Sequence, residues 1–249
     1  MIKCRQGLHL GGRVDLDVDF VNIRRRTVIN AIASEAQTPR DANKRDRYHH
    51  GDLRQALIRR AAEVIDSEGI EALTLRGLAR DLGVSHGAPN RHFKTKGDLL
   101  AALATEGYTA LREATLSAAE SAGEDPWVRL NYMGRGFLRW AFENPASFRA
   151  ITHPDVERYA DAELLQATEE FSGAVRAVIA ETQADGRHPE VDLDVLTQFT
   201  NAVPFGVAMM HRQGVLEATL HVEDREAFIA QVIELVCPIA DRLAAQDSR

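Results

Sequence analysis

Apolar side chains recur at helical spacing through most of the chain after residue 50. In the stretch 51–69, Leu53, Leu57, Ala61 and Val64 are three or four residues apart and form one stripe. Positions with this spacing share one face of an α-helix. Similar apolar stripes occur near 99–122, 126–143, 159–183, 191–213 and 224–245. Residues 13–23 alternate in the manner of a strand, but a single strand has nothing to pair with in a helical chain. The pattern therefore predicts an all-α fold.

Residues 74–93 predict two short helices joined by a tight turn. Thr74 suits the start of the first helix, because its hydroxyl can accept a hydrogen bond from a free backbone N–H. Gly83 tolerates the left-handed conformation that ends many helices. Ser85 can cap a second helix that extends to about His92, and Pro89 in its first turn predicts a short, slightly irregular helix. Two helices about such a turn form a helix-turn-helix, whose second helix lies in the DNA major groove.

The polar side chains that follow the turn are mostly hydrogen-bonding groups and cations, which suit bases and phosphates. An ordinary helical corner would explain the turn and the apolar face, but not this composition. We therefore expect DNA contacts from Arg47, Arg54, Thr74, Ser85, His86, Asn90, Arg91, His92, Lys94 and Lys96. Residues 95–98 then form a capping-box sequence that opens a long helix.

Residues from about 48 to 111 resemble the DNA-binding domain of the TetR family of one-component transcriptional regulators. The matching positions are Ala61-Ala62, Gly69, Leu73-Thr74-Leu75, Leu78-Ala79, Leu82-Gly83-Val84-Ser85, His92-Phe93, Lys96 and Leu99-Leu100. The family usually has a tyrosine two residues before the His-Phe pair, where this chain has Asn90. Asparagine can also hydrogen-bond a phosphate or a base edge. The stretch 142–149 resembles effector domains of the same family.

Three regions follow from these patterns: a basic, disordered extension over 1–46, a DNA-binding domain over 47–111, and a ligand-binding and dimerisation domain over 112–249. The net charge of −7 by itself argues against a nucleic-acid partner. However, residues 1–46 and 47–96 each carry +3, whereas residues 97–249 carry −13. A basic head on an acidic body fits DNA binding by the head. The extension could alternatively be a basic arm that reaches the minor groove.

Large aromatic side chains are concentrated in the second half, and they either fill the core or line an effector cavity between helices. They are Trp127, Phe137, Trp140, Phe148, Phe171 and Phe205. We expect a small, largely apolar effector of unknown identity. The last two predicted helices have wide apolar stripes, which favours a homodimer that pairs them in a four-helix bundle. The expected interface residues are Leu196, Phe199, Val203, Phe228, Val232, Leu235 and Ile239.

No catalytic motif, phosphate loop, dinucleotide-binding pattern or HExxH sequence is present, so we expect no enzyme activity and no cofactor. Cys4 and Cys237 are the only cysteines and offer no metal site. We expect a cytoplasmic protein without a signal peptide or a membrane contact, because no apolar run is long enough. The predicted function is that of a ligand-released repressor at a palindromic DNA operator. The alternative is a helical sensor, or an architectural protein, without operator-specific binding.

Overall fold

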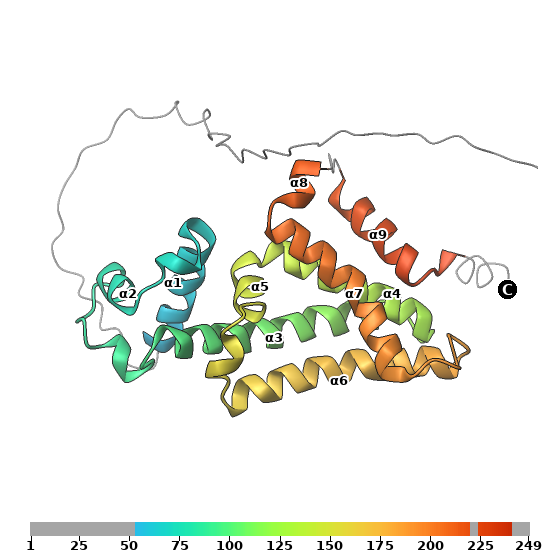
Figure 1. Ribbon diagram of the computed structural model, residues 1–249, viewed down its shortest axis with the longest axis horizontal. Helices are drawn as coiled ribbons and strands as arrows, with labels where there is room; N and C mark the ends of the chain where they lie inside the picture. The colour runs from blue at the N-terminus through green and yellow to red at the C-terminus, as the bar shows by residue number, and fades with distance from the viewer. Residues whose placement is uncertain (1–52, 220–223, 241–249) are drawn as a thin grey trace, which may run out of the picture. The chain divides into compact units, whose positions relative to one another are not determined.

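The computed structural model describes residues 53–219 and 224–240 (Figure 1). The described residues contain helices and no strand, which confirms the all-α prediction. The predicted extension over 1–46, and Arg47 after it, lie outside the described residues. The α-helices are α1 (Leu53–Glu68), α2 (Leu75–Asp81), α3 (Lys96–Glu120), α4 (Pro126–Glu143), α5 (Pro145–Ile151), α6 (Ala162–Ala184), α7 (Leu193–Arg212), α8 (Val215–Thr219) and α9 (Arg225–Val236). The described residues also form the 3-10 turns η1 (Ile70–Ala72), η2 (Pro89–Arg91) and η3 (Val156–Tyr159).

Side-chain caps explain where several helices begin. The Thr74 hydroxyl accepts a hydrogen bond from the backbone N–H of Gly77 at 3.1 Å. The capping box predicted before α3 is complete: Thr95 Oγ1 accepts from the Asp98 N–H at 3.1 Å, and Asp98 Oδ2 accepts from the Thr95 N–H at 2.9 Å. These bonds satisfy backbone donors that have no partner within the helix.

The long helix α3 contacts α1, α4, α5 and α6, and it runs beside α6 (Figure 1). Its closest neighbour is α4, where Gly136 lies against the α3 backbone. A Cβ atom added at Gly136 would lie 2.9 Å from Ala118 Cβ and 3.0 Å from the Ala114 carbonyl oxygen. Glycine at this position therefore lets the two helices approach closely.

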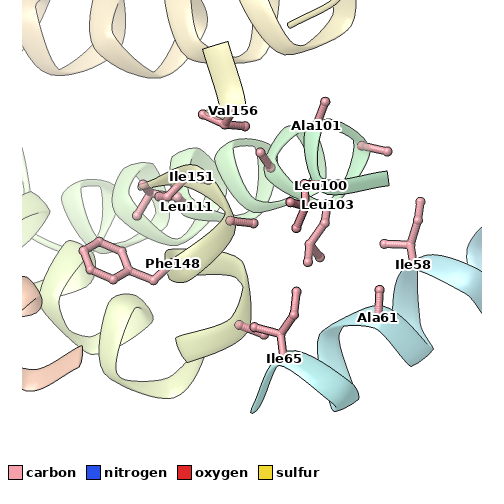
Figure 2. Close-up of a cluster of buried hydrophobic side chains, with 14 of the residues drawn as sticks. Ile58, Ala61, Ile65, Leu100, Ala101, Leu103, Leu111, Phe148, Ile151 and Val156 are labelled. Atoms are coloured by element: carbon pink, nitrogen blue, oxygen red, sulfur yellow. The ribbon is translucent and has the colours of Figure 1, made fainter. Parts of the chain in front are cut away.

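One apolar core connects the helix-turn-helix region to the helices behind it. Figure 2 shows Ile58 and Ile65 of α1 in the same cluster as Leu103 of α3 and Phe148 of α5. All four side chains are at least 96% buried, with exposures of 1%, 0%, 4% and 1%. A displacement of α5 would therefore disturb the packing of α1 directly, because buried side chains are close-packed.

The C-terminal helices differ from the prediction. The helix expected over 224–245 ends at Val236, because Cys237 precedes a proline and such a residue is disfavoured in helical geometry. Glu234 then accepts hydrogen bonds from the backbone N–H groups of Ile239 and Ala240, at 2.7 and 2.9 Å. The short helix α8 was not expected. It follows Gly214, whose φ of +71° ends α7.

The expected dimer-interface residues divide into three groups. Leu196 and Ile239 are 2% and 1% exposed, so they belong to the core of their own chain and are not available to a partner. Phe228 and Val232 are partly buried against that core. Phe199, Val203 and Leu235 are 62%, 41% and 88% exposed, and they remain the candidates for an interface.

Candidate nucleic-acid interface and internal cavity

The turn between α2 and the following element has the predicted glycine geometry. Gly83 has a φ of +66°, and the Val84 N–H donates to the Ala79 carbonyl at 2.9 Å. This bond is typical of a Schellman ending, in which left-handed backbone at glycine lets the next residue close the helix. Val84 then packs against the core cluster. The turn therefore directs the chain after α2 away from the helix axis.

The second helix of the motif is shorter than predicted. Helical structure is confined to the 3-10 turn η2, instead of extending from Ser85 to about His92. Pro89 has no N–H to bond back to Ser85. Most of the surrounding bonds span three residues, such as Ala88 to Ser85 at 2.9 Å and His92 to Pro89 at 2.9 Å. The predicted irregularity at this proline thus restricts the helix to a single turn.

Five of the predicted DNA-contacting side chains are exposed in the stretch 85–94, which contains this turn. They are Ser85, His86, Asn90, Arg91 and Lys94, whereas His92 is half-buried. Residues 74–96 contain five Lys or Arg residues and only one carboxylate, Asp81. Asp81 Oδ2 accepts from Arg60 Nε and Nη2 of α1, at 3.1 and 3.0 Å. Hydrogen bonds to Glu63 and Asp81 raise the pKa of Arg60. The corner is therefore positively charged.

Three other predicted DNA-contacting residues have structural partners. The Arg54 guanidinium lies 5.6 Å from the centroid of the Phe93 ring. The Thr74 hydroxyl caps α2. Lys96 Nζ donates to the Ile70 carbonyl oxygen of η1. Each of these side chains keeps an N–H or O–H group that is available to DNA. The contacts nevertheless hold the side chains against neighbouring residues of the same domain. Arg47 lies outside the described residues.

Three contacts join the helices on either side of the helix-turn-helix, α1 and α3, to the elements behind them. Arg149 of α5 donates from Nη1 to the Ile65 carbonyl of α1 at 2.6 Å. Asp66 accepts from the backbone N–H of Ala146. Desolvation raises the pKa of Asp66, while the nearby Arg149 charge and the Ala146 bond oppose that increase. At the start of α3, the ring of Tyr159 lies directly on Gly97, where a Cβ atom would overlap it.

The helices behind the corner form a cavity of about 550 Å³, and its wall includes exposed residues of α7 such as Phe205. Residues from α3, α4, α5, α6, α7 and α9 line it, and none of these described residues carries a charge. Four of the six aromatic side chains noted in the sequence lie on its wall: Phe137, Phe148, Phe171 and Phe205. Trp140 is instead 6% exposed in the core, and Trp127 packs near Arg187. An apolar wall without charged groups suits a largely apolar ligand.

Polar groups in the cavity wall were not predicted from the sequence. They include Gln198, Thr200 and Asn201 of α7, and Thr168 and Ser172 of α6. Tyr108 of α3 also faces the cavity. Burial raises the pKa of the Tyr108 hydroxyl, and a hydrogen bond with Thr168 opposes that shift. Such groups give a ligand a defined orientation. The polar cluster within the otherwise apolar α7 was the available sequence signal.

The described residues contain no group of three His, Cys, Asp or Glu side chains arranged to hold a metal ion. None of the described helices is long and apolar enough to cross a membrane.

Comparisons with known sequences match both halves of the chain. Residues 57–103 match the profile of bacterial regulatory proteins of the tetR family, and residues 130–236 match a tetracyclin repressor-like C-terminal domain. The class D tetracycline repressor of Escherichia coli is 33% identical over 108 residues, which cover 43% of this chain and 48% of that protein. The class H repressor of Photobacterium damsela subsp. piscicida aligns equally well. The chain thus spans about half the length of the curated relatives it matches.

Solved structures share the fold over most of their length. A protein of unknown function from Rhodococcus sp. RHA1 aligns with a TM-score of 0.64 and 26% identity, over 77% of this chain and 95% of that one. The TetR family transcriptional regulator PfmR from Thermus thermophilus aligns with a TM-score of 0.56 and 20% identity, over 73% and 96%. At that identity the second likeness concerns the fold alone. The two matching profiles together cover more than half of the chain and establish that it belongs to the TetR family.

Proposed function

We propose that this protein is a DNA-binding transcriptional repressor that leaves its operator when a small molecule occupies the cavity. One observation carries the proposal: the exposed, positively charged corner leads directly into α3, and the same helix lines the cavity through Tyr108, Leu111 and Thr115. Only Phe93 and Lys94 separate His92 from the capping residue of α3. The names of the aligned tetracycline repressors support the assignment of a repressor.

Phosphate contacts by Arg47, Arg54, Arg91, Lys94 and Lys96 provide most of the affinity in this proposal, because the rest of the chain is acidic. Ser85, His86, Asn90 and Arg91 reach base edges or phosphates. Asparagine pairs with adenine and arginine with guanine, and each good pair contributes about 1–3 kcal/mol of discrimination. The short η2 turn limits how many bases a single corner can contact.

The release mechanism uses the two links between the corner and the cavity. A ligand wedged beside α3 tilts that helix and the corner attached to it. It also displaces α5, which carries Phe148 in the cavity wall and Arg149 in the bond to α1. In a dimer, either movement changes the separation of the two corners. Affinity then falls because both can no longer enter successive major grooves.

A homodimer supplies the second corner, since one helix-turn-helix contacts too few bases to select a site in a genome. The exposed apolar side chains Phe199, Val203 and Leu235 on α7 and α9 support pairing of these helices with those of a second copy. The palindromic operator follows from the two-fold symmetry of such a dimer.

Footprinting on the DNA upstream of the gene for this protein tests the proposal. The expected result is two protected half-sites about one helical turn apart. A protein that binds small molecules but protects no DNA would favour the alternative, a helical sensor without operator-specific binding. Uniform protection without half-sites would favour an architectural role.

A further inference from the structure

Arg187, in the loop between α6 and α7, is a buried cation with an exposure of 3%. Its backbone N–H donates to the Thr182 carbonyl at 2.9 Å, which holds the loop against the end of α6. Among the described residues, no carboxylate forms an ion pair with its guanidinium. Desolvation lowers the pKa of Arg187, and Cys237 opposes the shift. Buried arginines are almost always paired with an anion, so this one is unusual.

The contacts of the Arg187 guanidinium are neutral. It lies 5.9 Å from the centroid of the Trp127 ring, and its two hydrogen-bond partners belong to the cavity wall. Nη1 donates to Thr200 Oγ1 at 3.1 Å, and Nη2 donates to the Val236 carbonyl at 3.3 Å. Thr200, Val236 and Cys237 all line the cavity. The cation therefore lies immediately behind one stretch of the wall.

Thr200 presents an unused donor at the same place. Its side-chain oxygen accepts the bond from Arg187, so its hydroxyl hydrogen must point elsewhere. No acceptor for that hydrogen occurs among the residues that the structure describes, although Thr200 is only 5% exposed. A buried donor without an acceptor is costly, and a ligand atom that accepts from it would remove the cost.

Another explanation of Arg187 is purely structural. Val236 is the last residue of α9, and a cation near a helix C-terminus is stabilising. This explains the bond to the Val236 carbonyl. It does not explain why Thr200, a residue of the cavity wall, accepts from the same guanidinium but has no acceptor for its own hydroxyl hydrogen among the described residues.

We propose that the cavity binds a small monocarboxylic acid with an apolar chain, whose carboxylate accepts from Thr200 and is neutralised by Arg187. The chain then lies along α7 toward α5. Thr200 and Met209 both line the cavity and are nine residues apart, which corresponds to about 13 Å along the helix. Beyond Thr200 in that direction, the rings of Phe205 and Phe148 have centroids 6.0 Å apart. The inference rests on the proposed function only for the role of the bound acid as the effector.

Calorimetric titration with decanoate and decanamide at neutral pH tests the inference. The two probes share an apolar chain and a carbonyl acceptor, but only decanoate is charged. A charge-assisted hydrogen bond should make decanoate bind about ten- to a hundredfold more tightly. Arg187→Met should remove this preference while decanamide affinity stays the same. Thr200→Val should also weaken decanoate binding. Thr197→Val is the matched control, because Thr197 lies on the same helix outside the cavity wall and its hydroxyl already donates to the Leu193 carbonyl at 2.7 Å.

Equal or tighter binding of decanamide would overturn the inference, as would binding of neither probe. A preference for decanoate that persists in Arg187→Met would overturn it as well. If Arg187→Met does not fold, the two probes are compared on the wild type and on Thr200→Val. A preference for decanoate that is as large in Thr200→Val as in the wild type would then overturn the inference. A separate DNA titration distinguishes the two proposals. If decanoate binds but no bound compound releases DNA, the proposal of ligand release is contradicted and this inference is not. If neutral compounds bind and release DNA but decanoate does neither, this inference is contradicted and the proposal of ligand release is not.

Discussion

Gly97→Ala should reveal whether Tyr159 is packed on the start of α3. Gly97 is the second residue of α3, two residues after Thr95, and a Cβ atom there would overlap the Tyr159 ring. Tyr159 is 41% exposed, so its ring can be pushed outward only by giving up this contact. The substitution therefore tests a contact between η3 and the helix that follows the proposed DNA-binding corner.

Two opposing effects determine the expected magnitude. Replacing glycine by alanine within a helix stabilises by about 0.5–1 kcal/mol. Overpacking against a fixed neighbour costs about 1–3 kcal/mol. In the wild-type background we therefore expect Gly97→Ala to destabilise by up to about 2 kcal/mol. With Tyr159→Ala already present, the same substitution should stabilise by about 0.5–1 kcal/mol, because nothing opposes it.

Urea unfolding of the four proteins of this cycle, at one fixed protein concentration, measures the coupling. Gly173→Ala on α6 is the matched control, because a Cβ atom there meets nothing within 4 Å. That control should be stabilised. If Gly97→Ala stabilises the wild type as much as Gly173→Ala does, or has the same effect with and without Tyr159, the proposed contact is wrong.

Three further substitutions test other parts of the account. Arg91→Ala should weaken binding to the footprinted site by about 1–3 kcal/mol per corner, whereas Arg176→Ala on α6 should not. If Arg91→Ala and the wild type have equal affinities in an anisotropy titration, Arg91 is not part of the interface. Leu235→Asp should give monomers by light scattering. Leu165 is also exposed, but Leu165→Asp should remain a dimer. If Leu235→Asp is still a dimer, α9 is not part of the interface. Arg149→Met should lower the free energy of unfolding by about 1–2 kcal/mol, and an unchanged urea midpoint would mean that its bond to Ile65 contributes nothing.

Features that depend on neighbouring residues could be predicted from the sequence. The Thr74 cap, the left-handed Gly83 and the Thr95–Asp98 capping box each involve groups within five residues of one another, and each occurs as expected. The apolar spacing predicted the main helices for the same reason. The end of α9 also had a local signal, Pro238, but the apolar stripe continued past it in the sequence.

Features that depend on distant residues could not be predicted in the same way. Arg187 meets Thr200 and Val236, which are 13 and 49 residues away, so its position behind the cavity depends on the packing of α6, α7 and α9. Apolar periodicity also could not separate Leu196, which is buried, from Phe199, which is exposed on the same helix. Both fit a helical stripe, and only the neighbouring helices decide which one is covered.

The salt dependence of operator binding tests the central claim most directly. Anisotropy titrations of the footprinted DNA, repeated over a series of salt concentrations, give the number of phosphates that the protein neutralises. The logarithm of the affinity should fall linearly with the logarithm of salt, by about 0.9 for each phosphate contact. Lys94→Gln should make this slope shallower by roughly one unit for each corner bound, without changing which sequence is preferred. Affinity that is independent of salt, or a slope unchanged in Lys94→Gln, would contradict the proposal that this corner binds DNA.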